Sequence, residues 1–270
     1  MFSTQLSGKT FCLLLMALLL SLGCSITEEK IRNWKGTQNG PGKLAEVVLD
    51  DSVSFDLRAK AAMALMEINR TDLFVDSFRK VPAQKADALI EQATPMFAAR
   101  MRGREPDLGL MESTVTSEQI MAKDGLYLMI DFAGARSRPL LEKALVEWCS
   151  GGNYNIRAMA GYNVRTVAKK VGAPAAVGLA SLLTIDQIAV KPIADLIREI
   201  GDPAALSLAS GTLADTLLKN VGKFGKSHLE AAAVIGGDGW VGRRGRRRPI
   251  ELWHELSLRS TDSAAKQRGR

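Results

Sequence analysis

The sequence has only two histidines and three cysteines among 270 residues, so it offers few side chains for metal binding or nucleophilic catalysis. Neither histidine stands at a metal-ligand spacing from the other or from Cys149. We therefore expect His228 and His254 to be surface or capping residues. The sequence favours a protein without a catalytic centre, metal or cofactor, and an active site built from residues scattered along the chain is the alternative.

The amino-terminal apolar run, Phe11 to Gly23, is short for a membrane-spanning segment. Its thirteen residues would make a helix of roughly 20 Å, whereas the hydrocarbon core of a bilayer is about 30 Å thick. The length instead suits the apolar part of a secretory signal, with Lys9 before the run and Cys24 directly after it. We expect residues 1–23 to be a signal peptide.

The residues at the end of this run, SLGC at 21–24, resemble the lipobox of bacterial lipoproteins. The resemblance implies that Cys24 becomes the first residue of the mature protein, is acylated, and holds the chain at a membrane of the cell envelope. Ser25 after the cysteine would, by that family's sorting habit, favour the outer membrane, facing the periplasm. Upstream the family usually has Leu and then Ala or Ser, where this sequence has Ser21 and Leu22. An ordinary cleaved signal and a buried amino-terminal helix are the alternatives.

Positive charge is concentrated at the carboxyl end. The formal net charge is +7, but nine Lys or Arg and three acids lie in residues 243–270, which leaves the preceding part nearly neutral. Clustered arginine attracts phosphate and other anions. The candidate contacts to an anionic partner are Arg243, Arg244, Arg246, Arg247 and Arg248. Because no ladder of aromatic side chains accompanies them, we expect a solvated end, and a nucleic-acid binder that uses this tail is an alternative.

Between Pro41 and Ile235 the apolar residues recur at helical spacing. Two such sets are Leu141, Ala144, Leu145 and Trp148, and Val164, Val167, Ala168 and Val171. Alanine and leucine dominate where valine and isoleucine would favour strands, and no convincing alternation of β-branched residues is present. The sequence therefore predicts an all-α fold.

Helix punctuation also recurs within this region. Residues 163–177, NVRTVAKKVGAPAAV, align with residues 192–206, PIADLIREIGDPAAL, at an offset of 29 residues. Each copy has a glycine suited to the end of a helix and then a proline, Pro174 or Pro203, suited to the first turn of the next. Such recurrence indicates a repeat protein in which each helical pair buries its face against its neighbours.

Residues 43–68, KLAEVVLDDSVSFDLRAKAAMALMEI, resemble a HEAT or HEAT-like repeat: the first helix ends near Asp51, and the second carries Arg58 followed by small residues. The resemblance implies an α-solenoid of about five stacked antiparallel helix pairs. It also implies an inter-repeat ladder of Asp51, Arg58 and Arg157, although Ser150 replaces the acid in the later copy. The concave face would bind another protein. An irregular helical bundle is the alternative fold, and a HEAT-like lyase or isomerase acting on a small molecule is the alternative function.

These inferences divide the chain into four parts. Residues 1–23 are the signal peptide, 24–41 a lipidated tether, 42–235 the HEAT-like repeat domain and 236–270 a basic, Gly/Arg-rich tail that is partly disordered. A long loop at 101–117 is expected inside the array because it contains Pro, Gly and polar residues and has little periodicity. The sequence thus predicts a non-catalytic, membrane-anchored scaffold of the bacterial cell envelope.

Overall fold

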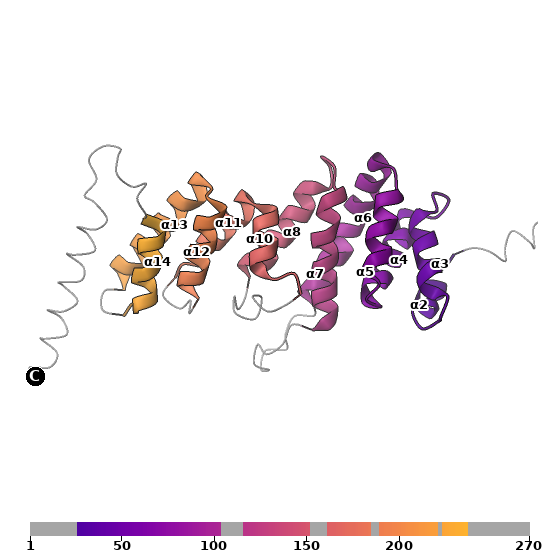
Figure 1. Ribbon diagram of the computed structural model, residues 1–270, viewed down its shortest axis with the longest axis horizontal. Helices are drawn as coiled ribbons and strands as arrows, with labels where there is room; N and C mark the ends of the chain where they lie inside the picture. The colour runs from indigo at the N-terminus through magenta and orange to yellow at the C-terminus, as the bar shows by residue number, and fades with distance from the viewer. Residues whose placement is uncertain (1–25, 104–115, 152–160, 185–188, 221–222, 237–270) are drawn as a thin grey trace, which may run out of the picture. The chain divides into compact units, whose positions relative to one another are not determined.

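The computed structural model describes residues 26–103, 116–151, 161–184, 189–220 and 223–236 (Figure 1). Within these ranges all regular structure is helical, with twelve α-helices and one short 3₁₀-helix. The predicted all-α fold is therefore confirmed. The chain forms two compact units, Met1–Ala93 and Thr94–Arg270.

The first unit contains helices α2 to α5 and the start of α6. Their bounds are α2 Glu28–Trp34, α3 Gly40–Leu49, α4 Phe55–Glu67, α5 Thr71–Lys80 and α6 Ala83–Arg102, which continues into the second unit. Helix α4 packs against α2, α3 and α5. Its buried alanines are Ala59, Ala61, Ala62 and Ala64. Alanine is the strongest helix former and its small side chain lets neighbouring helices approach closely.

The core of the first unit also draws on α3 and α5. Leu44, Val47 and Val48 are buried on α3 at spacings of three and four, and Phe74 and Phe78 are buried on α5 with ring centroids 4.9 Å apart. Full burial of a side chain of this size is worth about 1.5–3 kcal/mol. Helices of this length are marginal in isolation, so this packing, rather than helix propensity alone, holds them in place.

Helix α2 lies in the segment that the sequence predicts to be a tether, residues 24–41, and that prediction is wrong from Glu28 on. The Thr27 hydroxyl caps the helix by accepting a hydrogen bond from the Lys30 N–H at 3.3 Å. Ile31 is buried, and the helix packs against α3 and α4. A threonine followed by acidic residues is a helix-start signal. Thr27, Glu28 and Glu29 therefore mark the start of α2 in the sequence.

The second unit contains the end of α6 and eight further elements. Their bounds are α7 Ser117–Met129, η1 Ile130–Phe132, α8 Arg138–Ser150, α10 Val164–Val171, α11 Ala173–Ala180, α12 Val190–Ile200, α13 Pro203–Lys219 and α14 Lys226–Gly236. Helix α11 packs against both α8 and α13, while α12 packs against α14. The two predicted apolar sets on α8 and α10 are buried throughout, which confirms the helical spacing from which they were inferred.

Both predicted helix–glycine–proline turns are present in the second unit. Gly172 and Gly201 end α10 and α12 with φ of 76° and 75°, values that favour glycine. Pro174 and Pro203 lie in the first turns of α11 and α13. The sequence pattern therefore fixes where these four helices end and begin.

The predicted loop at 101–117 has helical ends. Its first two residues complete α6, and at its far end Thr116 caps α7. The Thr116 hydroxyl accepts from the Gln119 N–H at 3.2 Å, and the Gln119 side-chain oxygen accepts from the Thr116 N–H at 2.8 Å. Residues 104–115 lie outside the described residues.

Candidate functional site

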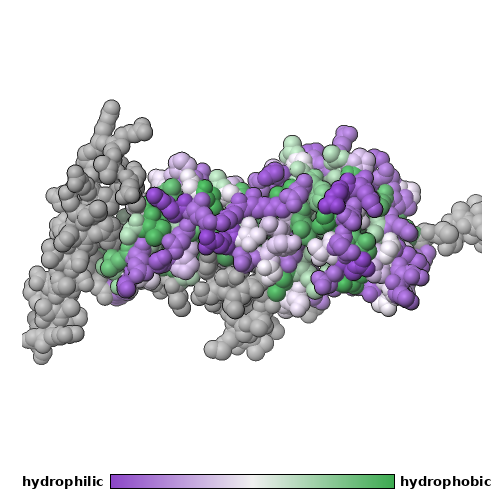
Figure 2. Space-filling view, viewed as in Figure 1, coloured by the Kyte–Doolittle hydropathy of each residue, from purple (hydrophilic) through white to green (hydrophobic). Residues whose placement is uncertain are grey.

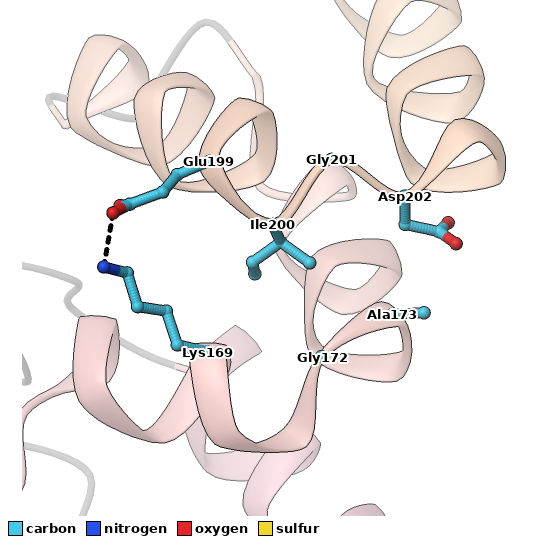
Figure 3. Close-up of a pocket in the computed structure, with 7 residues that line it drawn as sticks. All are labelled: Lys169, Gly172, Ala173, Glu199, Ile200, Gly201 and Asp202. Atoms are coloured by element: carbon cyan, nitrogen blue, oxygen red, sulfur yellow. Dashed lines mark ion pairs between the residues drawn. The ribbon is translucent and has the colours of Figure 1, made fainter.

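The two glycine turns line one pocket, which we call the paired-turn pocket (Figure 3). It has a volume of about 540 Å³ and is widely open to solvent. Its lining residues are Lys169, Gly172, Ala173, Glu199, Ile200, Gly201 and Asp202. The 29-residue recurrence in the sequence therefore corresponds to two turns that lie side by side in space.

One side of the paired-turn pocket carries a cluster of two cations and one carboxylate. Glu199 forms ion pairs with Lys169 and with Arg165, whose Nη2 lies 2.6 Å from the Glu199 Oε2. The hydrogen bond from Lys169 is the main cause that lowers the pKa of the Glu199 carboxyl from 4.5. These pairs are solvent-exposed, so they order the side chains of α10 and α12 without adding much stability.

The opposite side of the pocket is formed by Asp202, with Ile200 lying between it and the charge cluster (Figure 3). The Asp202 carboxylate accepts a hydrogen bond from the Ala205 N–H at 2.8 Å and so caps α13. The pocket thus has an aliphatic centre flanked by polar groups. None of the residues that line the pocket is a nucleophile paired with a base.

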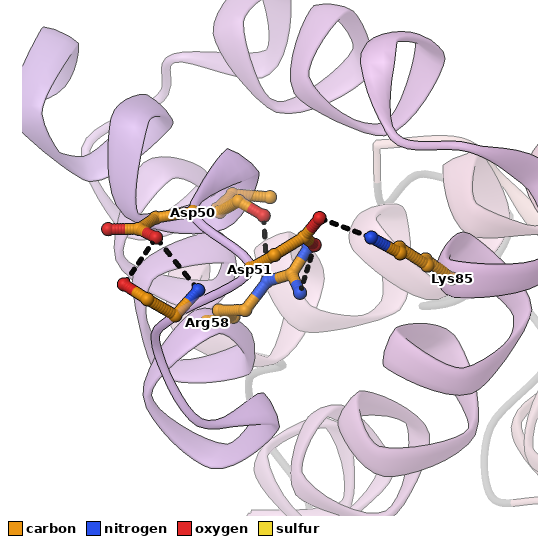
Figure 4. A network of polar contacts seen from close by, with 6 residues as sticks. Asp50, Asp51, Arg58 and Lys85 are labelled. Carbon is orange, nitrogen blue, oxygen red and sulfur yellow. Dashed lines mark hydrogen bonds and ion pairs between the residues drawn. The ribbon is translucent and has the colours of Figure 1, made fainter.

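A second polar cluster, in the first unit, joins Asp51 and Arg58, two of the three predicted ladder residues (Figure 4). The Arg58 Nη1 lies 3.1 Å from the Asp51 Oδ1, and the Arg58 Nε donates to the Val48 carbonyl at 2.9 Å. The other Asp51 carboxylate oxygen pairs with Lys85 on α6. The hydrogen bond from Lys85 is the main cause that lowers the pKa of the Asp51 carboxyl from 3.8.

Arg58 is the buried member of this cluster. Its side chain is only 2% exposed, and its Nη2 has no hydrogen-bond partner among the described residues. The guanidinium also lies over the Phe55 ring, 5.5 Å from its centroid. A buried guanidinium needs its carboxylate because an uncompensated buried charge is costly. Asp51 pairs with Arg58 on α4 and with Lys85 on α6, so it connects these two helices.

A third cluster surrounds Lys123 on α7 and was missed by sequence reasoning. Lys123 is fully buried, contacts the Asp124 carboxylate, and donates to the Tyr162 carbonyl at 2.5 Å. Its Nζ lies 5.0 Å from the centre of the Trp148 ring. The Asp124 Oδ1 accepts from the Tyr162 N–H at 3.1 Å. Burial is the main cause that lowers the pKa of Lys123 from 10.5.

The sequence predicts that His228 is a surface or capping residue, and the structure shows that it does not lie at the surface. It is 5% exposed, and its Nε2 lies 3.2 Å from the Thr184 carbonyl oxygen. The spacing of His228, Ala231, Ala232 and Ile235 places all four on the buried face of α14. This spacing is visible in the sequence and could have predicted that His228 is buried.

Several predicted site residues lie outside the described residues. They are Cys24, Arg157, Arg243, Arg244, Arg246, Arg247, Arg248 and His254. Within the described parts of the chain, no group of three or more His, Cys, Asp or Glu side chains is placed to hold a metal ion. None of the helices described has both the length and the apolar character needed to cross a bilayer.

Comparison with known proteins gives no relative: no protein-family model, curated protein or solved structure matches the chain.

Proposed function

We propose that this chain is a HEAT-like helical-repeat module that binds another protein at the paired-turn pocket, held at a membrane through Cys24. One observation carries the proposal: the same helix–glycine–proline–helix turn recurs after 29 residues, and both copies line one pocket. Repeat proteins commonly use surfaces built from equivalent positions of successive repeats, because stacking places those positions side by side.

The packing within each unit supports an α-solenoid of stacked helix pairs. In the second unit α11 lies against α13, and α12 lies against α14. Helices two apart in the chain therefore stack on each other, which is the arrangement expected when helix pairs repeat. In the first unit Asp51 pairs with Lys85, which is 34 residues further along the chain. This 34-residue separation falls in the range of known helical repeats, about 33–47 residues, and the 29-residue offset of the two glycine turns lies just below that range.

The shape of the paired-turn pocket favours a protein partner over a small molecule. Small-molecule sites are concave and mostly apolar, and they bury most of the ligand's surface. This pocket is open and only its centre, at Ile200, is aliphatic. An extended peptide segment can place one apolar side chain on Ile200 and exchange hydrogen bonds with the charged rim formed by Lys169, Glu199 and Asp202.

The link between the proposed anchor at Cys24 and the first helix is short. Because α2 begins at Glu28, only the residues from Cys24 to Thr27 separate the acylated position from the helical body. Extended chain spans at most about 3.3–3.6 Å per residue, so this link reaches roughly 14 Å. The first unit would therefore stay close to the membrane surface rather than range freely on an 18-residue tether.

Affinity capture from the native host with charge-reversal variants tests the proposed binding. Lys169→Glu breaks the pair with Glu199 and adds a carboxylate to the pocket, so specific partners should be depleted from the captured material. Lys80→Glu, an exposed position at the end of α5 in the other unit, is the matched control and should capture as wild type does. If both variants are folded by circular dichroism and both capture the same partners as the wild-type protein, binding at this pocket is refuted.

A further inference from the structure

The polar sides of α10 and α12 adjoin and form one surface, which we call the α10–α12 surface. Hydrophilic residues gather over these two helices in the space-filling view (Figure 2). All buried residues of the two helices are apolar, so their charged residues lie on the sides that face solvent. The ion pairs of Glu199 on α12 with Arg165 and Lys169 on α10 join the two sides.

Cations outnumber carboxylates on the α10–α12 surface. Its charged residues are the cations Arg165, Lys169, Lys170, Lys191 and Arg198 and the carboxylates Asp195 and Glu199. Lys170 pairs with Asp131 of η1, and Lys191 pairs with Asp195. The other three cations therefore have one carboxylate, Glu199, among them. By contrast, α11 has no charged residue, and α13 has one acid and one base.

Arg198 is the cation of this surface that has no ion pair among the described residues. Its side chain is exposed on the last turn of α12. The 29-residue offset that aligns the two glycine turns also aligns Arg198 with Lys169. Each turn thus has a cation three residues before its glycine, Gly172 or Gly201. Successive copies of the repeat place positive charge at the same position beside the paired-turn pocket.

The two carboxylates that line the paired-turn pocket are both engaged. Asp202 accepts a hydrogen bond from the Ala205 N–H at 2.8 Å, and Glu199 is shared between Arg165 and Lys169. An incoming carboxylate can therefore compete with Glu199 for two cations, and it meets Arg198 unpaired.

We propose that the partner at the paired-turn pocket presents an extended acidic segment, whose carboxylates pair with Arg165, Lys169 and Arg198. This inference rests on the proposed function, because it names the chemistry of the same partner. Opposite charges across an interface speed the encounter and fix the register of the bound segment. An extended segment advances about 3.3 Å per residue, so carboxylates within a few residues of an apolar side chain on Ile200 reach the cations around it.

Fluorescence anisotropy of a labelled heptapeptide, six glutamates around a central leucine, tests the inference on the full-length chain. Glu199→Gln removes the competing carboxylate and should tighten binding about two- to fivefold. Arg198→Gln removes the unpaired cation and should weaken binding by a similar factor. Asp215→Asn and Lys219→Gln make the same charge changes on α13 and are the matched controls, which should bind as wild type does. Circular dichroism checks that each variant is folded.

Carbodiimide coupling shows where the peptide lies. The reagent joins a glutamate carboxylate to a lysine amine in contact with it, and mass spectrometry of the digested protein should find the peptide on Lys169. Guanidinium groups do not react in this way, so the arginines at 243–248 do not contribute to this measurement. A heptapeptide with glutamine in place of glutamate is the control for charge and should not bind.

The inference is overturned if Glu199→Gln and Arg198→Gln both bind the acidic peptide as wild type does, or if coupling occurs on other lysines and not on Lys169. It is also overturned if phosphatidylglycerol vesicles or a single-stranded oligonucleotide bind more tightly than the peptide and respond to the same two variants, because the surface would then recognise phosphate. The proposed function fails separately, when Lys169→Glu captures the wild-type set of partners.

Discussion

Gly172 and Gly201 occupy equivalent places in two turns 29 residues apart, yet their backbones differ. Both have positive φ, 76° and 75°, but ψ is −134° at Gly172 and 15° at Gly201. The conformation of Gly201 is the ordinary left-handed one, which asparagine also adopts, whereas that of Gly172 is close to a region populated almost only by glycine. The two turns share a sequence pattern but not the same backbone requirement.

This difference predicts unequal effects of the same substitution. Gly201→Ala should lower the free energy of unfolding by about 1 kcal/mol, and Gly172→Ala by about 2–3 kcal/mol. A Cβ has room at both positions, its closest neighbour being the Arg198 carbonyl oxygen at 3.8 Å from Gly201, so the loss is one of backbone conformation. Urea unfolding measures both values. Equal losses at the two positions would contradict the assigned backbone angles.

Gly211→Ala is the control for these glycine variants. Gly211 lies inside α13 with helical backbone, and an added Cβ meets no other atom. Alanine there should raise the free energy of unfolding by about 0.5–1 kcal/mol. A loss at this position would show that alanine substitution is harmful in this unit for reasons other than backbone conformation.

The contacts of Asp51 with Arg58 and Lys85 predict that Arg58 contributes more to the free energy of unfolding than Lys85 does. Arg58→Ala removes a buried side chain, its bond to Val48 and its pair with Asp51, and should cost at least about 2 kcal/mol. Lys85→Ala removes an exposed pair, which is typically worth about 0–1 kcal/mol. Thermal or urea unfolding ranks the two. A Lys85 variant as unstable as the Arg58 variant would show that Asp51 serves mainly the contact to α6.

Lys123 predicts a specific pH dependence. Burial holds its pKa below the 10.5 of the unfolded chain, so between the folded and unfolded pKa values the unfolded chain binds the extra proton. The free energy of unfolding should therefore rise as pH increases through that window. Lys123→Met removes the titrating group, and its curve from pH 7 to 10.5 should lack this rise. Parallel curves for the two proteins would argue against a depressed pKa.

The anchor predicts a change of location without a change of fold. Intact mass of the native protein should show a chain that begins at acylated Cys24 and sediments with membranes, and Cys24→Ala should lose both properties. Cys149→Ala, at a buried position on α8, is the control and should remain in the membrane fraction. A soluble wild-type chain that retains residues 1–23 would rule out the lipoprotein hypothesis.

The fold class and the helix ends were accessible from sequence because they depend on local patterns. Helical spacing identified the buried faces of α8 and α10, and glycine followed by proline identified the two turns. The paired-turn pocket itself was not predicted, since the alignment of 163–177 with 192–206 does not say that the two turns are adjacent. That adjacency comes from the packing of α11 against α13.

The sequence was least informative for polar residues inside the protein. An adjacent Lys–Asp pair such as Lys123 and Asp124 is common on helix surfaces, and its burial depends on Trp148 and Tyr162 from other segments. His228 was misplaced for the opposite reason, because its polarity outweighed its position on the apolar face of α14. In both cases tertiary contacts, rather than residue type, decide the environment.

The central claim is that the paired-turn pocket is a contact surface for another protein, and photocrosslinking in living cells of the native host tests it most directly. A probe at Ile200 should yield a discrete adduct with a partner in the membrane fraction. A probe at Asn33, an exposed position on α2, should not yield that adduct. The absence of an adduct from position 200, or the same adducts from both positions, would contradict the account.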